Sequence, residues 1–315
     1  MPEPARVVAL AGGVGGAKLA HGLQSHLGDR LTVVVNTADD TERHGLLVMP
    51  DHDTVMYTLA GLANREQGWG LEGETFAAAG MLERYGEETW FRLGDRDLAT
   101  HIARTHRLAA GGRLTEVCLA LQRSVGVLAR ILPMTDASVR TEVRTDDGWL
   151  DFQDYFVRRH QEPEVREVRF RGIERAKATP EVHDAIGSAS VLVVAPSNPI
   201  VSVGPILAVP GLGEAIDSAR ARGVPVVAVS GIVGGKALKG PADRMLASLG
   251  HEVSALGVAR LYAGWVDTFV LDSVDSALRP AIESLGMKVT VTDTIMSDDS
   301  ARDRLAGEIL DSLLT

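Results

Sequence analysis

The 315-residue chain has a single cysteine, Cys118, which excludes an intramolecular disulfide and any zinc site built from several cysteines. No apolar run reaches the roughly 18 residues that span a bilayer, so we expect no membrane partner. Basic residues are also few, since 32 Lys and Arg against 42 Asp and Glu give a formal net charge of −10. Nucleic acid is therefore not an expected partner, because phosphate backbones select basic surfaces. These absences leave a cytoplasmic enzyme as the expected class.

The composition is that of a globular protein, with 45% hydrophobic and 23% charged residues. A chain of this length can bury a sizeable core, as one large domain or as two smaller ones. An acidic protein can still bind an anionic small molecule if backbone amides, a helix N-terminus, lysines or a divalent cation help locally. These are the features to expect at a binding site.

Apolar strands alternate with helical patterns over much of the chain. The strands are continuous Val, Ala and Leu runs at residues 7–10, 31–35, 191–195, 224–230, 268–271 and 288–292. Helical patterns follow several of them, at residues 17–27, 205–222, 241–249, 277–285 and 301–314. Continuous apolar strands are typical of a sheet that is covered on both faces. The pattern predicts an α/β fold with a Rossmann-like, doubly wound, mostly parallel sheet.

Residues 71–184 break this alternation. The elements expected inside this segment are helices at 97–110 and 114–132, and a hairpin of strands 139–145 and 149–157 around a turn at 146–148. We interpret the segment as an inserted α+β subdomain that covers the edge of the sheet. Residues 1–70 and 185–315 then form the Rossmann-like, nucleotide-binding core.

The first strand runs into a glycine-rich loop at residues 12–18. It has neither the Gly-Lys-Ser/Thr of a Walker loop nor a clean dinucleotide fingerprint. Glycines nevertheless expose backbone amides, and the helix that follows adds its positive end, so the loop suits a phosphate. The candidate ligand-binding residues are Gly12, Gly13, Gly15, Gly16 and Lys18. The alternative is a tight strand-to-helix turn without a ligand.

Four aspartates follow the second strand, Asp39 and Asp40 directly and Asp51 and Asp53 after a short loop. So many carboxylates would repel one another unless protons or a hard cation lay between them. Magnesium prefers one or two carboxylates together with substrate phosphate oxygens. We therefore predict an Mg²⁺ site at Asp39, Asp40 and Asp51. The alternative for Asp53 is the N-cap of the next helix.

A polar, proline-constrained loop at residues 197–205 ends the strand at 191–195. Its prolines fix the backbone and leave Ser and Asn groups free to bond a base or ribose. The candidate nucleotide-binding residues in it are Ser197, Asn198, Pro199, Ser202 and Gly204. A second glycine-rich loop at 230–241 carries two lysines that suit a diphosphate, and Lys236 is assigned to the site. The alternative for this second loop is a solvated connection.

Residues 90–97 pack aromatic, basic and acidic side chains into eight positions. One interpretation is a core Trp-Phe pair followed by the N-cap of a helix at Asp97. The functional interpretation is an aromatic shelf for a planar ligand, formed by Trp90, with Arg92 orienting the ligand.

Taken in order, these motifs closely resemble the 2-phospho-L-lactate transferase family of coenzyme F-420 biosynthesis. The matching segments cover the chain nearly end to end, at residues 12–18, 36–40, 50–54, 90–97, 133–136, 197–207 and 232–241. The resemblance implies an Mg²⁺-dependent enzyme that joins a guanosine-diphosphate-linked three-carbon acid to the deazaflavin alcohol Fo and releases GMP. The acid is lactate in archaea and phosphoenolpyruvate-derived in the actinobacterial branch, which this sequence resembles more.

By position, Asp53 and Arg92 match the family's deazaflavin-contacting pair, and Asp39 and Asp40 match its metal region. The resemblance thus implies Asp53, Asp40 and Asp39 as catalytic residues, with Asp53 holding or deprotonating the attacking hydroxyl. It implies Asp53, Arg92 and Trp90 as the acceptor site. We expect a homodimer.

Two other classes compete with this interpretation. A non-catalytic nucleotide-sugar-binding regulator, related to gluconeogenesis factor, would share the glycine loop and the sheet but should lack residues 90–97. A nicotinamide oxidoreductase would need an acidic residue at the end of the second strand to bond ribose, and Asn36 stands there.

Overall fold

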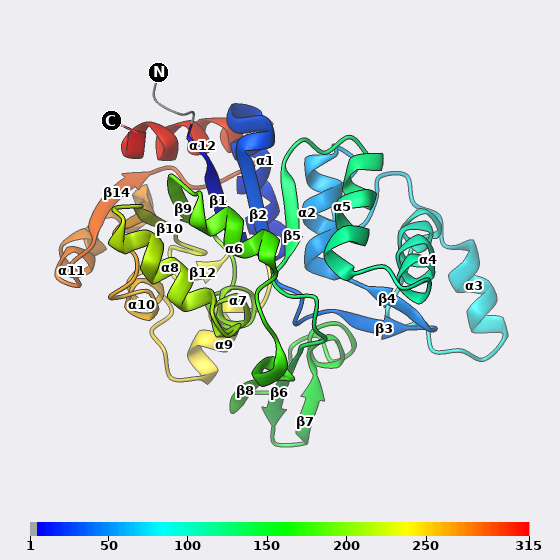
Figure 1. Cartoon of the computed structure of the whole chain (residues 1–315). Helices are drawn as coiled ribbons and strands as arrows, with labels where there is room; N and C mark the ends of the chain where they lie inside the picture. The colour runs from blue at the N-terminus through cyan, green and yellow to red at the C-terminus, as the bar shows by residue number, and fades with distance from the viewer. Residues whose placement is uncertain (1–4, 315) are drawn as a thin grey trace.

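The computed structural model describes residues 5–314, and the side chains of this range to residue 312. Its centre is a seven-stranded sheet in which every neighbouring pair is parallel, with the order β14-β13-β10-β9-β1-β2-β5. The strands are β1 (Val7–Ala11), β2 (Leu31–Val35), β5 (Arg130–Pro133), β9 (Val191–Val194), β10 (Val226–Val229), β13 (Thr268–Asp272) and β14 (Lys288–Thr292). Helices flank the sheet (Figure 1). The predicted α/β fold is confirmed.

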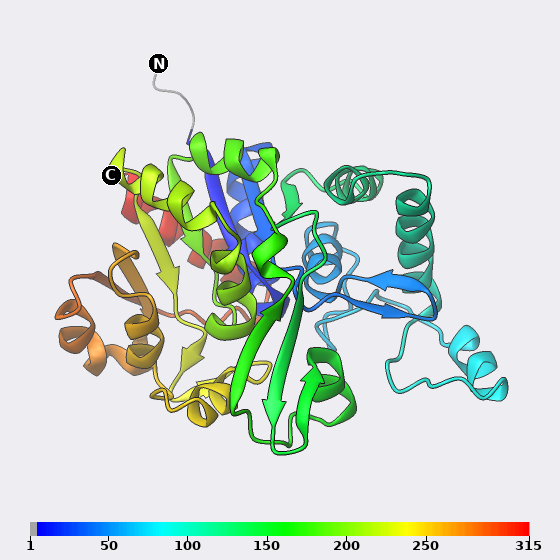
Figure 2. The ribbon, with the colours of Figure 1, turned by 60° about the horizontal axis from the view of Figure 1, so that its bottom comes forward.

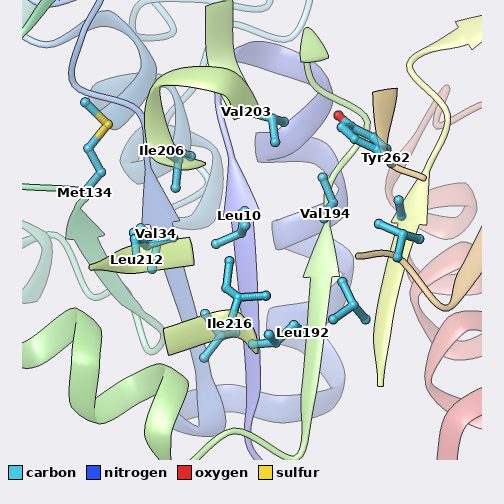
Figure 3. Packing of buried hydrophobic residues seen from close by; sticks show 14 of the residues in the cluster. Leu10, Val34, Met134, Leu192, Val194, Val203, Ile206, Leu212, Ile216 and Tyr262 are labelled. Atoms are coloured by element: carbon cyan, nitrogen blue, oxygen red, sulfur yellow. The ribbon is translucent and has the colours of Figure 1, made fainter. Parts of the chain in front are cut away.

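The strand sequences explain this arrangement, because β1 (VVALA) and β2 (LTVVV) are buried at every position. On one face the sheet packs against α1 (Gly13–Leu27), α2 (Pro50–Leu59) and α12 (Asp299–Leu314). On the other face it packs against α6 (Pro180–Gly187), α7 (Gly204–Ala208), α8 (Leu212–Ala221), α10 (Ala255–Leu261) and α11 (Arg279–Glu283). Figure 3 shows Leu10 and Leu192 of the sheet beside Ile216 of α8.

The strand order changes direction between β1 and β9. The chain runs outward from β1 through β2 to β5, then returns to β9 beside β1 and runs the other way to β14. In open α/β sheets, ligands bind outside the carboxyl ends of the strands at such a switch point. The loops that follow β1 and β9 are therefore the place to look for a site.

The segment 71–184 forms two groups beside the main sheet (Figures 1 and 2). The helical group contains α3 (Ala77–Arg84), α4 (Asp95–Ala109) and α5 (Leu114–Ser124). The other group is an antiparallel sheet of β6 (Arg140–Thr145), β7 (Gly148–Asp151) and β8 (Glu167–Arg171), in the order β7-β6-β8. Between the two groups the chain returns to the main sheet as β5. Strand β5 thus lies in the core sheet although its residues fall within the predicted insertion.

Several predicted elements have different bounds in the structure. The helix expected over 114–132 ends at Ser124, because Gly126 adopts a positive φ of 77° and the following apolar run becomes β5. The strand expected over 149–157 stops at Asp151, and a π-helical turn at Asp154–Arg158 follows it. The helix expected over 205–222 breaks into α7 and α8, since Gly211 has a φ of 87° between them.

Some short elements had no counterpart in the sequence prediction. The hairpin β3 (Thr41–Arg43) and β4 (Leu46–Val48) lies between β2 and α2, and β11 (Ile232–Val233) pairs with β12 (Lys236–Ala237) before α9 (Ala242–Ser248). Within residues 5–314 no single helix is long and apolar enough to cross a membrane. One bent pair, Pro199–Ala208 and Leu212–Ala221, meets that length and composition only when its two helices are taken together.

The contact of α1 with α12 gives a test of the packing. A Cβ atom added at Gly22 of α1 would lie 2.1 Å from the backbone oxygen of Arg302 in α12. We expect Gly22→Ala to lower the free energy of unfolding by ~1–3 kcal/mol, because the helices must move apart. Gly213→Ala in α8 is the matched control. It meets no atom within 4 Å and should raise stability by up to ~1 kcal/mol. Urea unfolding measures both, and equal stability of the two variants would refute the packing argument.

Candidate active site

A cavity of about 540 Å³ opens at the switch point between β1 and β9. Its walls come from the loops that follow these two strands, from α2, and from residues 67–70, 90–93 and 152–160. This volume is typical of a pocket for a small molecule or cofactor. The inserted segment and the core sheet therefore both contribute to one site.

The loops after β1 and β9 are held together by hydrogen bonds. The Ser197 Oγ accepts from the Gly12 N–H at 3.0 Å and donates to the Gly12 carbonyl at 2.8 Å. Glycine is needed here, because a Cβ at Gly15 would lie 2.2 Å from the Pro196 oxygen, and one at Gly16 would lie 2.8 Å from Ser197 Oγ. Gly12, Gly13 and Gly15 line the cavity at the start of α1. The positive end of this helix therefore faces the space where an anion would bind.

Asp39 and Asp51 lie in the cavity wall on the side of the glycine loop. Burial raises the pKa of Asp51 to about 6, although Asn36 Nδ2 donates to its Oδ2 at 3.0 Å. Burial and the nearby Asp51 charge raise the pKa of Asp39 well above its usual value, and Asp39 Oδ1 has no hydrogen-bond partner among the described residues. Two such carboxyl groups suit a bound cation or shared protons.

Asp40 is placed differently from the other predicted metal ligands. Its side chain is buried behind the cavity wall and does not line the cavity. Burial raises its pKa well above the usual value, and Arg140 and Arg104 oppose that shift. The structure thus brings Asp39 and Asp51 to the cavity and leaves Asp40 outside it.

Asp53 lines the cavity but is already paired with a cation. Its Oδ1 accepts a hydrogen bond from the fully buried Arg104, and His52 Nδ1 lies 3.5 Å from the same oxygen. Burial alone would raise the pKa of Asp53, but the Arg104 charge holds that pKa below its usual range. The N-cap alternative is wrong, because α2 begins at Pro50 with Met49 as its N-cap and Asp53 lies inside the helix. A carboxylate held ionised in this way accepts hydrogen bonds well but is a weak base.

The predicted nucleotide loop divides into lining and supporting residues. Ser197, Asn198 and Ser202 line the cavity, whereas Pro199 and Gly204 do not. The Asn198 side-chain oxygen accepts from the backbone N–H groups of Ile200 and Val201 at 2.9 and 3.3 Å. Asn198 therefore caps the turn that follows it, in addition to facing the cavity.

The two lysines assigned from sequence do not line the cavity. Lys18 Nζ donates to the Met296 carbonyl at 2.8 Å, and Lys236 is exposed in β12. Lys239 lines the cavity instead, and its Nζ donates to the Gln67 carbonyl at 3.0 Å. Lys239 belongs to the same glycine-rich loop as Lys236, so the loop was recognised but the side-chain direction was not.

Trp90 and Arg92 both line the cavity. The Trp90 ring is edge-on to Phe91, and the Arg92 guanidinium lies 4.2 Å from the Phe76 ring centroid. Phe152 and Phe156, stacked at 5.6 Å, add a second aromatic wall. The cavity thus has a polar half near the glycine loop and an aromatic half near residues 90–93.

Sequence reasoning missed the other polar residues of the aromatic half. Tyr57, Asp97 and His101 also line the cavity, with the Tyr57 hydroxyl donating to Asp97 Oδ1 at 2.7 Å. The available signal was the spacing of residues 97 and 101, which places them one helical turn apart in α4.

The Asp53–Arg104 pair predicts a large effect on stability. Asp53→Asn should lower the free energy of unfolding by about 3–5 kcal/mol, because it leaves the buried Arg104 charge without its partner. Asp40→Asn is the matched control. Burial raises the pKa of Asp40, so the neutral amide should cost far less. Urea unfolding at pH 7 compares the two, and a silent Asp53→Asn would contradict the pairing.

Comparison with known proteins agrees with this geometry. Residues 7–302 match the family model of 2-phospho-L-lactate transferase CofD. The chain is 45% identical over 313 residues to a phosphoenolpyruvate transferase of Streptomyces griseus, covering 97% of this chain and 98% of that protein. It is 39% identical over 301 residues to a 2-phospho-L-lactate transferase of Methanosarcina mazei, covering 95% and 98%.

A solved structure supports the fold alone. It is a member of the UPF0052 family from Bacillus halodurans, with a TM-score of 0.62 at 16% identity, and the match covers 98% of this chain and 100% of that one. The sequence relatives carry the assignment further. The chain belongs to the 2-phospho-L-lactate transferase CofD family, and it is a transferase of 2-phospho-L-lactate or phosphoenolpyruvate groups.

Proposed function

We propose that this enzyme transfers the phosphoenolpyruvyl group, or the 2-phospholactyl group, from a guanosine-diphosphate-linked donor to the ribitol hydroxyl of Fo. The products are GMP and dehydro coenzyme F-420-0, or coenzyme F-420-0 when the acid is lactate. The observation that carries the proposal is that one cavity combines the N-terminus of α1, which suits a phosphate, with an aromatic wall. The higher identity to the phosphoenolpyruvate transferase favours that donor.

On the donor side, the diphosphate lies at the N-terminus of α1, where the amides after Gly12 meet negative charge. Lys239 reaches the same space and supplies a positive charge. Asp39 and Asp51 fit a magnesium ion, because Asp39 has a buried, unpartnered oxygen and both carboxyl groups have raised pKa values. A bound Mg²⁺ neutralises charge that develops on the transferred phosphoryl group.

On the acceptor side, the deazaflavin ring lies against Trp90 and the Phe152–Phe156 pair, with Arg92 at its edge. The ribitol chain then extends towards Asp53. One ribitol oxygen forms a bond to the phosphorus that bears the three-carbon acid, and the bond from that phosphorus to the GMP oxygen breaks. Because Arg104 keeps Asp53 ionised and weakly basic, Asp53 holds the chain rather than taking the hydroxyl proton, which leaves on the phosphate of the departing GMP. Catalysis is then mainly positioning and electrostatics.

The proposal is tested by incubating the purified protein with Fo and each donor in turn. Mass spectrometry should detect GMP together with dehydro coenzyme F-420-0 from the phosphoenolpyruvate-derived donor. Excess chelator should abolish turnover and added Mg²⁺ should restore it. Binding of guanosine nucleotide without product from either donor would favour a non-catalytic regulator. Full turnover in chelator would remove the metal from the mechanism.

Two lysines of one loop test which side chain contacts the diphosphate. Lys239 lines the cavity, whereas Lys236 was assigned from the sequence. Lys239→Met should weaken GDP binding about 10-fold or more, since it removes a charge next to the diphosphate. Lys236→Met is the matched control, because that lysine is exposed outside the cavity and its loss should leave affinity within about 2-fold. Isothermal titration calorimetry measures both. A larger loss of GDP affinity in Lys236→Met than in Lys239→Met would instead assign diphosphate binding to Lys236.

A further inference from the structure

Two polar atoms in the aromatic half of the cavity are buried and have no hydrogen-bond partner among the described residues. They are Oδ2 of Asp53 and Nε2 of His101, and the two residues are 4% and 1% exposed. Both residues line the cavity. A buried polar atom without a hydrogen-bond partner is costly, and almost all buried polar atoms in proteins have one. In a cavity wall, such atoms are explained by a ligand that pairs with them.

The neighbouring Arg104 determines which His101 nitrogen carries the proton. Arg104 Nη1 lies 3.3 Å from His101 Nδ1, and a guanidinium only donates, so Nδ1 accepts. Because Nδ1 accepts, the ring proton is on Nε2, which makes Nε2 a donor. Asp97 Oδ1 is 3.3 Å away but is not in hydrogen-bonding geometry, and it already accepts from Tyr57. The Nε2–H of His101 is thus free for a ligand.

Arg104 also determines which Asp53 oxygen is free. Because Asp53 Oδ1 accepts from Arg104, Oδ2 is the open acceptor, and it lies 3.6 Å from Nδ1 of the His101 ring. The two residues thus offer one donor, His101 Nε2, and one acceptor, Asp53 Oδ2. A hydroxyl group, which donates once and accepts twice, matches this pair. A phosphate or carboxylate would be repelled by Asp53, and an ammonium group would meet the Nε2–H.

We propose that His101 and Asp53 together bind one hydroxyl group of the acceptor's polyol chain. The hydroxyl oxygen accepts from His101 Nε2, and its hydrogen is donated to Asp53 Oδ2. This assignment rests on the proposed function, in which the ribitol chain of Fo supplies the hydroxyl. A donor to the oxygen lone pair lowers the nucleophilicity of that oxygen, so the bound hydroxyl is a neighbour of the one that attacks phosphorus. His101 is then an acceptor-binding residue.

A metal ion is the competing occupant. Single ligand atoms of Asp53, Asp97 and His101 all lie within 4.8 Å of one another. Coordination by Nε2 would require its proton to move to Nδ1, which would then face the Arg104 donor. Arg104 also already occupies Asp53 Oδ1, so Asp53 would offer a metal ion a single oxygen. The geometry therefore favours the hydroxyl, and metal binding becomes an outcome of the test.

Fluorescence titration with Fo tests the assignment on two variants of His101. His101→Asn keeps an acceptor for Arg104 but has no group at the Nε2 position, so Fo should bind roughly 10- to 100-fold more weakly. His101→Gln places an amide N–H near that position and should recover most of the affinity. GDP affinity should stay unchanged in both variants.

His52→Asn is the matched control. His52 also contacts Asp53 Oδ1, at 3.5 Å, but does not line the cavity, so its loss should leave Fo affinity within about 3-fold. An equal loss of Fo affinity in His52→Asn and His101→Asn would overturn the assignment, because both substitutions would then act only by displacing Asp53.

Analogues of Fo that each lack one ribitol hydroxyl identify the bound group. One analogue should bind the parent enzyme as weakly as Fo binds His101→Asn. The same analogue should bind His101→Asn with no further loss of affinity, because the contact is already absent. The parent enzyme should still turn this analogue over. The proposal would be overturned if, for every analogue, the losses of binding free energy from the missing hydroxyl and from His101→Asn were additive. Tight Zn²⁺ or Mn²⁺ binding to the parent enzyme that His101→Asn abolishes would also overturn it.

A parent enzyme that does not bind Fo at all would count against the proposed function. The protonation of His101 is read separately by ¹⁵N NMR of histidine-labelled parent enzyme without ligand. A proton on Nε2 is the expected result, and a proton on Nδ1 would overturn the inference whatever the substrate.

Discussion

The close approach of two loops at the switch point is the constraint on which the site depends. Strands β1 and β9 are neighbours in the sheet, and Gly12 and Ser197, which are 185 residues apart in the chain, exchange two hydrogen bonds just beyond them. Pro196 leaves no room for a side chain at Gly15. This backbone contact fixes the N-terminus of α1 against the loop after β9. The polar half of the cavity exists because these two backbones meet.

The cavity also separates its carboxyl groups by their surroundings. Asp39 and Asp51 lie among few cations, and burial raises the pKa of each. Asp53 is as buried as Asp39, yet Arg104 holds its pKa below the usual range. One wall therefore favours a cation or protons, and the other presents a permanent hydrogen-bond acceptor. Groups whose environments push their pKa values apart have different chemical roles.

The sequence predicted those features that depend on local pattern. Continuous Val-rich strands and the glycine loop identify the sheet and its ligand edge, because burial on both faces leaves a readable signature. Strand β5 was hidden, since its apolar residues continue the pattern of α5 and only the positive φ of Gly126 separates them. The directions of Lys18 and Lys239 depend on tertiary contacts with Met296 and Gln67. No local pattern reports such contacts.

The pairing of α2 with α4 shows why the aromatic half of the cavity was only partly visible from the sequence. Asp53 and Tyr57 are one turn apart on α2, and Asp97, His101 and Arg104 lie on one face of α4. Two contacts join these faces over more than one helical turn. One is the ion pair of Asp53 with Arg104, and the other is the hydrogen bond from Tyr57 to Asp97. Residues 90–93 directly precede α4, so the contact that holds Asp53 in place also positions Trp90 and Arg92. A buried charge pair is a poor source of net stability, but an unpaired buried charge is expensive, so other placements of α4 are penalised. The charges of α2 and α4 thereby align the inserted helix with the core sheet and build the aromatic half of the cavity in the same step.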